Sequence, residues 1–318
     1  MNREMTGESG EFAVRAEGLC RRFGALQAVR DLSFAVARGE IFGFVGPDGA
    51  GKTTIMRMLA GVLLPDKGEI FLEGIDVVAE PERAKPILSY MPQRFGLYED
   101  LTVAENIFFY GELFELPWRV RRARARQLLQ AAGLLSFERR LAGQLSGGMK
   151  QKLGLVCALL HTPKVLLLDE PTTGVDPLSR RDFWAILYNL RESGVTILFS
   201  TAYMDEAERC SRLALMHEGE IRLCDSPARL KAAMPGALLE VVSADPRAAH
   251  KALTGAPGVL GLLLMGDRVH VRVDNALRRK GELEARLLGE GVGPAAIQPI
   301  EPGIEDVFVA LLGQEGAA

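Results

Sequence analysis

Short apolar runs, separated by glycine, proline and charged residues, divide most of the chain into strand and helix patterns. Strand patterns at 13–18, 27–34 and 40–45 lead into a glycine-rich turn and a helical pattern at 54–59. Further buried strands are predicted at 87–91, 165–168 and 195–199. The second of these has four consecutive apolar residues, as expected of a strand covered on both faces. The alternation predicts an α/β fold around an open sheet.

A mostly helical stretch interrupts this alternation. Helical patterns cover 103–114 and 118–132, and a further helix is predicted from 145–151 to about residue 161. We therefore expect a domain at 12–235 that contains an antiparallel β-subdomain and a helical subdomain at about 97–160. Residues 1–11 are polar, lack the apolar core of a signal peptide and are expected to form a flexible N-terminus.

The pattern changes after residue 235. Strands are predicted at 238–243, 258–264, 268–273 and 295–299, with helices at 246–253 and 275–288. This order favours a small α+β ferredoxin-like domain over 236–318, closed by a helix at 304–312. The domain shows no catalytic constellation. Extra packing or stabilisation of a dimer is the favoured interpretation of its role, and sensing of a ligand is the alternative.

Composition narrows the class of protein. Hydrophobic content of 48% with 25% charged residues is typical of a soluble globular protein, and a formal net charge of −3 gives no overall reason to expect nucleic acid. The four cysteines are scattered without a C-x-x-C pair, which suggests neither a zinc site nor a disulfide framework and suits a reducing cytosol. The longest apolar runs fall far short of the roughly 20 residues of a membrane helix, so a membrane role would require a partner.

The glycine-rich turn fits the pattern G-x-x-x-x-G-K-[ST] of a phosphate-binding loop, although a chance turn can fit it too. Glycines let backbone N–H groups approach a polyphosphate, and the next helix points its N-terminal dipole at the same anion. Lys52 would reach the β- and γ-phosphates, and the Thr53 hydroxyl would ligate Mg²⁺. The residues expected to hold the nucleotide here are Gly46, Asp48, Gly49, Ala50, Gly51, Lys52, Thr53 and Thr54.

Three more features fit a nucleotide site. The strand at 165–168 ends in Asp169 and Glu170, at the edge where open α/β sheets bind ligands. Asp169 would hold Mg²⁺ through its water shell, and Glu170 would polarise or deprotonate the water that attacks the γ-phosphate. Ser146, placed as an N-cap, opens a second helix start that suits an anion. Phe23 is expected either to stack on adenine or to cover the edge of the small sheet.

These residues together resemble the nucleotide-binding subunit of an ABC transporter over about 12–230. Residues 145–151 resemble the family signature LSGGQ, Gln93 the Q-loop, 174–177 the D-loop with Asp176, and Phe23 the A-loop. Residues 304–308 resemble the C-terminal extension of the daunorubicin-resistance type of ATPase, which belongs to ABC-2 exporters.

The resemblance implies ATP and Mg²⁺ as ligands and a head-to-tail pair of such domains. Each ATP would lie between the phosphate loop of one domain and Ser146, Gly147 and Gly148 of the other, with Asp176 near the same interface. Gln93 would sense the metal and act in catalysis and, with the loop 95–101, would contact a transmembrane permease. The chain would then be a cytoplasmic protein held on the inner face of the cell membrane, with no nucleic-acid partner. The pair could be a homodimer or a heterodimer. The transported substrate is chosen by a membrane subunit that is not part of this sequence.

Ala202 departs from the family pattern, which normally places a histidine there to contact the γ-phosphate. Alanine has no donor or acceptor, and loss of one positioned polar catalyst costs about 10²–10⁴ in rate. We therefore expect intact ATP binding and impaired hydrolysis at this chain's own site, while its signature completes a competent site on a histidine-containing partner. Asp48, where the family more often has asparagine, is a milder departure.

The alternative is a nucleotide-dependent clamp or regulatory scaffold that binds ATP, hardly hydrolyses it and acts by association. A member of the family that works on ribosomes or DNA is less expected, because no second set of these motifs occurs within the 318 residues.

Overall fold

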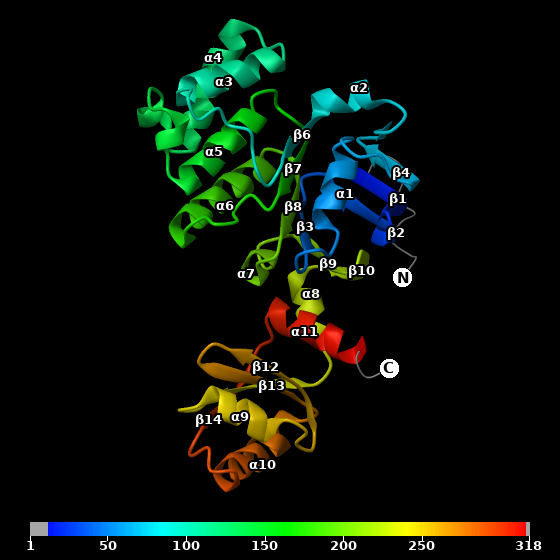
Figure 1. Cartoon of the computed structure of the whole chain (residues 1–318), viewed down its shortest axis with the longest axis vertical. Coiled ribbons are helices and arrows are strands. Elements are labelled where there is room, and N and C mark those ends of the chain that lie inside the picture. Colours follow the sequence, from blue (N-terminus) through cyan, green and yellow to red (C-terminus); the bar gives the residue numbers. More distant parts are fainter. Residues whose placement is uncertain (1–11, 316–318) are drawn as a thin grey trace. The chain divides into compact units, whose positions relative to one another are not determined.

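The computed structural model describes residues 12–315 and divides the chain into two compact units, 1–223 and 224–318 (Figure 1). The division falls before the expected boundary at 235/236, because helix α8 (Pro227–Ala232) contacts α11 (Ile304–Glu315) within the second unit. The N-terminus at 1–11, expected to be flexible, lies outside the described residues.

A six-stranded sheet with the order β10-β9-β3-β8-β7-β6 forms the centre of the first unit. Its strands β9, β3, β8, β7 and β6 are paired in parallel. Strands β3 and β7 are buried at every position, which explains their unbroken apolar sequences. The strand bounds are β3 Ile41–Val45, β6 Leu88–Met91, β7 Val165–Asp169, β8 Thr196–Thr201, β9 Arg212–His217 and β10 Glu220–Asp225.

A second, antiparallel sheet of the first unit has the order β2-β1-β4-β5. Its strands are β1 Phe12–Phe23, β2 Leu26–Ala37, β4 Lys67–Leu72 and β5 Ile75–Asp76. Helix α1 (Lys52–Leu59) lies between the two sheets, where four of its apolar side chains are buried (Figure 1). The mixed α/β class and the expected antiparallel β-subdomain are therefore present.

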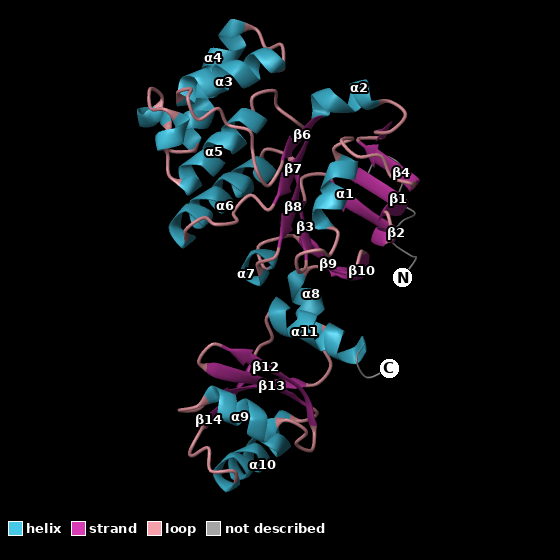
Figure 2. Cartoon of the chain, in the orientation of Figure 1, coloured by secondary structure: helices cyan, strands magenta, loops and turns pink. Residues whose placement is uncertain are grey.

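Helices α5 (Gly147–Ala158) and α6 (Pro177–Glu192) cover the other face of the six-stranded sheet (Figure 2). Beyond them lie α3 (Val103–Leu113) and α4 (Trp118–Ala131). Short helices α2 (Pro81–Ala84) and α7 (Met204–Ala207) complete the unit, with 3-10 turns at Lys85–Ile87, Leu135–Phe137 and Ala142–Gln144. Within residues 12–315, no helix combines the length and apolarity needed to cross a bilayer.

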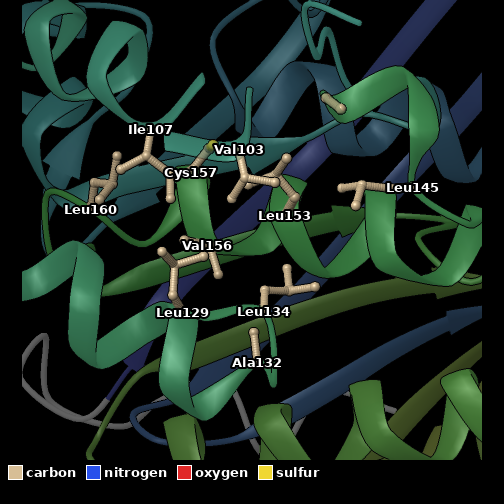
Figure 3. Close-up of a cluster of buried hydrophobic side chains, with 11 residues drawn as sticks. Val103, Ile107, Leu129, Ala132, Leu134, Leu145, Leu153, Val156, Cys157 and Leu160 are labelled. Atoms are coloured by element: carbon tan, nitrogen blue, oxygen red, sulfur yellow. The ribbon is translucent and has the colours of Figure 1, made fainter. Parts of the chain in front are cut away.

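The helical subdomain has an apolar core of its own, to which α3, α4 and α5 all contribute (Figure 3). Val103 and Ile107 of α3 meet Leu129 of α4 and Leu153 of α5, and each of the four is at most 3% exposed. Side chains spaced three and four apart on each helix produce this shared core.

The second unit has the expected ferredoxin-like order. Its four-stranded antiparallel sheet runs β12-β13-β11-β14. Helices α9 and α10 lie on one side of the sheet and α11 on the other (Figure 2). The bounds are β11 Ala237–Val242, α9 Pro246–Leu253, β12 Val259–Met265, β13 Arg268–Val273, α10 Ala276–Gly289 and β14 Ala296–Ile300.

Asn106, which is fully buried, fastens the loop before α3 to that helix. Its Oδ1 accepts from Tyr98 N at 2.9 Å, and its Nδ2 donates to Tyr98 O at 2.9 Å and to Thr102 O at 3.0 Å. The Asn106→Ala substitution would remove three hydrogen bonds and leave the Tyr98 amide without its partner, so we expect it to lower the free energy of unfolding by about 2–3 kcal/mol. Urea unfolding followed by tryptophan fluorescence measures this, because Trp118 and Trp184 both lie in the first unit.

The matched control is Asn189→Ala, at an exposed position on α6. It should change the free energy of unfolding by no more than about 0.5 kcal/mol. An equal loss in both variants would contradict the role given to Asn106.

Candidate functional site

A pocket of about 710 Å³ opens at the carboxyl ends of β3, β7 and β8. Seven of the residues expected to hold the nucleotide line it: Phe23, Asp48, Gly49, Gly51, Lys52, Thr53 and Thr54. Gln93 and Glu170, which were expected to act in catalysis, line it as well, whereas Gly46, Ala50 and Asp169 do not. Ala202 lines the same pocket, together with Leu26, Ala28, Thr173 and Tyr203. The carboxyl edge of a parallel sheet is where α/β proteins bind their ligands, so this pocket is the candidate site.

The glycines of the loop between β3 and α1 let its backbone lie against neighbouring strands. A Cβ at Gly46 would come 2.3 Å from Met216 O, and one at Gly51 would come 2.5 Å from Ala28 O. Gly51 also has a φ of +99°, which a larger residue rarely adopts. The loop leads directly into α1, which begins at Lys52. The N-terminus of this helix is directed at the pocket.

Lys52 is 4% exposed and is held by the loop that precedes it. Its Nζ donates to Gly46 O at 2.9 Å and to Pro47 O at 3.0 Å. The same Nζ lies 3.2 Å from Glu170 Oε1, which makes an ion pair across the site. The ammonium and the carboxylate therefore neutralise one another in the pocket.

Asp169, at the end of β7, is 1% exposed and accepts hydrogen bonds from three hydroxyl groups. Ser200 Oγ donates to Oδ1 at 2.8 Å, Thr53 Oγ1 to Oδ1 at 3.1 Å, and Tyr90 OH to Oδ2 at 3.2 Å. Burial and the charge of Asp169 raise the pKa of Tyr90 to about 12, so its hydroxyl remains a donor at neutral pH. Among residues 12–315 no basic side chain lies within ion-pair distance of this carboxylate, so the three hydrogen bonds stabilise its buried charge.

Glu170 adopts a strained backbone, with a φ of +48° that is uncommon outside glycine. Its amide N–H donates to Ser200 Oγ at 2.9 Å and holds this conformation. Its side chain lies between Lys52 and Gln93, whose Nε2 donates to Glu170 Oε2 at 3.0 Å. Backbone strain of this kind is found at functional sites, where the surroundings fix one side-chain direction.

Ala202 and Tyr203 form the corner that follows β8. The Tyr203 amide donates to Thr201 Oγ1 at 2.9 Å, and the Arg180 guanidinium carbon lies 4.3 Å from the centre of the Tyr203 ring. The corner is therefore ordered, and it presents a methyl group to the pocket at position 202.

Beneath this corner, the fully buried Glu206 joins three segments of the chain. Its carboxylate accepts from Thr172 Oγ1 at 2.6 Å, from Thr201 Oγ1 at 2.7 Å and from Trp184 Nε1 at 3.2 Å. Arg180 Nε lies 3.7 Å from the same carboxylate. The network fixes the corner at 201–203 relative to the loop after β7.

Phe23, 47% exposed, stands at the end of β1 and lines the pocket. Arg21 lies 5.1 Å from the centre of its ring. The exposed ring suits stacking, while its position on the last residue of β1 also agrees with covering the sheet edge, so both interpretations of Phe23 stay open.

Ser146, Gly147, Gly148 and Asp176 do not line this pocket. Ser146 is the N-cap of α5 and accepts from Met149 N at 3.3 Å, while Asp176 is the N-cap of α6 and accepts from Ser179 N at 2.9 Å. The backbone hydrogen bond from Ser179 lowers the pKa of Asp176. The structure therefore places these residues at two neighbouring helix starts of the same chain.

The oxygen atoms of Thr53, Asp169 and Gln93 lie near the loop and are the expected metal ligands. Hydroxyl, carboxylate and amide oxygens suit Mg²⁺, which keeps several waters and needs few protein ligands. The described residues hold no group of three His, Cys, Asp or Glu side chains placed to bind a metal. The donor set thus fits Mg²⁺ bound together with a phosphate.

Tyr90 and Ser200 are functional candidates that sequence reasoning missed. Ser200 is paired in register with Asp169 across β7 and β8, and Tyr90 lies on β6, the strand on the other side of β7. Neither belongs to a recognisable motif. The only signal was their position near the carboxyl ends of predicted strands.

Comparison with known proteins agrees with the geometry. The sequence pattern of the family described as "ABC transporter" matches residues 29–173. The chain is 35% identical to the daunorubicin resistance ATP-binding protein DrrA2 of Streptomyces coeruleorubidus, over 95% of this chain and 95% of that protein. It is 41% identical to the probable multidrug ABC transporter ATP-binding protein YbhF of Escherichia coli K12, over 96% of this chain.

This chain spans about half of YbhF, since the match covers 53% of that protein. A solved ATP-binding subunit of an ABC transporter is similar in structure, with a TM-score of 0.63 and 28% identity. The similarity covers 69% of this chain and 92% of that one.

Burial of Tyr90, together with the charge of Asp169 and the hydrogen bond to it, makes the free energy of unfolding fall at alkaline pH. An unfolded tyrosine ionises near pH 10, whereas the folded pKa of Tyr90 is about 12, so the unfolded chain loses its proton first. We expect the urea midpoint to fall between pH 8 and pH 11, and to fall less in Tyr90→Phe. The control is Tyr188→Phe on α6, which should keep the full decrease. An identical decrease in Tyr90→Phe would contradict the assignment.

Proposed function

This chain belongs to the ATP-binding proteins of the ABC transporter family, and we propose that it is the ATPase subunit of an exporter. The observation that carries the proposal is the convergence of Lys52, Thr53 and Glu170 on one pocket of about 710 Å³, with the buried Asp169 hydrogen-bonded to Thr53. Pockets of roughly 300–1,000 Å³ accommodate a small ligand or cofactor. Export is favoured over import because the similar proteins are named for drug resistance and multidrug transport.

Different groups of the protein bind the phosphates and the adenine of the nucleotide. The N-terminus of α1 and the ammonium of Lys52 bind the phosphates, because both are positive and both face the pocket. Phe23, whose exposed ring lines the same pocket, stacks on the adenine. The nucleotide phosphates compete with Glu170 for Lys52, so binding frees the carboxylate to act.

Mg²⁺, when bound, neutralises charge that develops on the phosphate oxygens. Thr53 would be a direct ligand, and Asp169 would hold its waters, with Gln93 as a further oxygen donor. Ser200 and Tyr90 donate hydrogen bonds to Asp169 and orient it toward Thr53.

Glu170 is the group that takes the proton from the attacking water or polarises it. Its strained backbone and its contacts with Gln93 and Ser200 fix the direction of the carboxylate. Ala202, which lines the same pocket, offers only a methyl group. We therefore propose that this site binds ATP normally and hydrolyses it slowly.

A second function is favoured by the same residue. A chain whose site lacks the imidazole would serve as a nucleotide-dependent clamp or regulatory scaffold, acting through ATP-driven association with little turnover. The two functions differ in the hydrolysis rate of the assembled protein, and they share every contact made to bound ATP.

The signature residues act on a second ATP-binding subunit. Ser146 and Gly147 are exposed and stay outside the pocket of their own chain, which supports a role toward a partner's γ-phosphate. Gly148, the third residue proposed to face the partner, is buried against α6, where a Cβ would lie 2.5 Å from Ser179. Asp176 is exposed beside them and would belong to the same interface.

The remaining partner is a transmembrane permease. The loop 95–101 and Gln93 would contact it, because the loop follows a site residue directly and carries the exposed Tyr98. In this assembly the chain sits at the inner face of the cell membrane and has no nucleic-acid partner. The substrate is then chosen by the permease.

Restoring the imidazole tests the proposed function. We expect Ala202→His to raise phosphate release at saturating Mg-ATP by about 10-fold or more, because one positioned polar catalyst is worth about 10²–10⁴. ATP affinity, measured separately by calorimetry, should change little. Lys52→Ala is the control that should abolish binding in either background.

An unchanged turnover in Ala202→His would show that the imidazole is not limiting. A fast wild-type rate in isolation would argue against the clamp. Failure of wild-type protein to bind ATP would remove both functions.

Mixed subunits test whether the signature acts on the partner. Gly147→Ala adds a methyl group where the nearest atom of the chain is 4.0 Å away, so it should fold normally and yet lose about 10-fold or more in turnover. Mixing Gly147→Ala with Lys52→Ala subunits should restore activity, because a head-to-tail pair then contains one intact site. The measurement is the rate of phosphate release. The variants are prepared in the wild-type chain or in the Ala202→His chain, whichever hydrolyses ATP faster. No recovery on mixing would indicate a site confined to one chain.

A further inference from the structure

The second unit contains a separate cavity of about 240 Å³. It lies on the face of the sheet opposite α9 and α10, where α11 contacts β12. Its walls are mostly apolar, contributed by Met234, Leu238, Leu260, Leu262, Leu263, Val309 and Ala310. Three polar side chains also line it: His270, Arg272 and Asp306.

Alternation along β13 explains why these polar side chains share a face. Val269, Val271 and Val273 enter the core against α9 and α10, so Arg268, His270 and Arg272 point to the other side. Arg268 lies 2.8 Å from the Glu240 carboxylate, and His270 Nδ1 lies 2.7 Å from Asp306 Oδ1. Two of the three therefore have an acidic partner.

Arg272 differs from its neighbours. It is 9% exposed, and Nη2 donates to Leu260 O at 3.0 Å. Among the described residues no carboxylate lies within ion-pair distance of its guanidinium, and burial lowers the pKa of Arg272 without an opposing charge. The residue across from it on β12 is Gly261, which has no side chain to cover the guanidinium.

Asp306 lines the same cavity, but its oxygens already have partners. Oδ1 meets His270, and Oδ2 accepts from Gly303 N at 2.9 Å. The residue also stands in the first turn of α11, where a helix dipole stabilises a negative charge. The carboxylate is therefore satisfied without Arg272.

A buried charge without a partner costs free energy, and an arginine fork matches a carboxylate in a bidentate pair. The apolar walls would take up a hydrocarbon body, and the volume equals that of about eight water molecules at roughly 30 Å³ each. We propose that this cavity binds a short-chain aliphatic carboxylate, with its carboxylate on Arg272 and its chain against Leu238, Leu260 and Leu263. The C-terminal unit is then a sensor for a small amphipathic anion.

Hexanoate, with eight non-hydrogen atoms, is a probe that fits this description. We expect isothermal titration calorimetry on the full chain to show saturable hexanoate binding at one site. Hexanol, which has the same chain length and no charge, should bind at least 10-fold more weakly. Inorganic phosphate, titrated into the Lys52→Ala chain so that the phosphate loop does not contribute, should also bind at least 10-fold more weakly, since it has no apolar part.

Two arginine variants complete the test. Arg272→Met should weaken hexanoate binding at least 10-fold, whereas Arg268→Met, on the same face and strand, should leave it unchanged. The comparison of hexanoate with hexanol in the wild-type chain decides the question independently if Arg272→Met does not fold. Equal binding of hexanoate and hexanol, equal binding of phosphate, no hexanoate binding, or full binding by Arg272→Met would each overturn the proposal.

Discussion

Three hydroxyl groups from three separate elements meet at the Asp169 carboxylate, and the whole site depends on this contact. Thr53 belongs to α1, Tyr90 to β6 and Ser200 to β8, so the buried charge ties the phosphate loop to both strands that flank β7. A carboxylate that is 1% exposed must be satisfied by such bonds, because water cannot reach it. Ser200 also holds the amide of Glu170, so one serine positions both acidic residues.

The methyl group at position 202 stands within an otherwise well-ordered corner. Glu206, the Thr201 hydroxyl and the stacked pair of Arg180 and Tyr203 hold that corner firmly. The absence of an imidazole is therefore a change of chemistry at one side chain, and the backbone around it keeps its support. For this reason the proposed function treats binding and turnover as separable properties of the site.

Much of the architecture could be predicted from the sequence, because buried parallel strands such as β7 are unbroken apolar runs and the β13 valines alternate strictly. Strands β4, β5, β9 and β10 escaped prediction; in β10 all six positions are half-buried and show no alternation. The motif residues around the phosphate loop were found because their chemistry requires a fixed local spacing. Tyr90 and Ser200 were missed because their contacts with Asp169 depend on how separate strands pair. The cavity at Arg272 was missed because the lack of a carboxylate near this arginine, among the described residues, can be seen only in the folded chain.

The contact between Lys52 and Glu170 has a consequence for how the pocket responds to its surroundings. With the two charges 3.2 Å apart, the resting pocket carries its own counter-ion, and an arriving polyanion exchanges one partner of the lysine for another. The electrostatic attraction gained when the polyanion binds Lys52 is then smaller than it would be for a lysine without a carboxylate partner. Because salt screens both arrangements, affinity for the polyanion should depend only weakly on ionic strength at this contact.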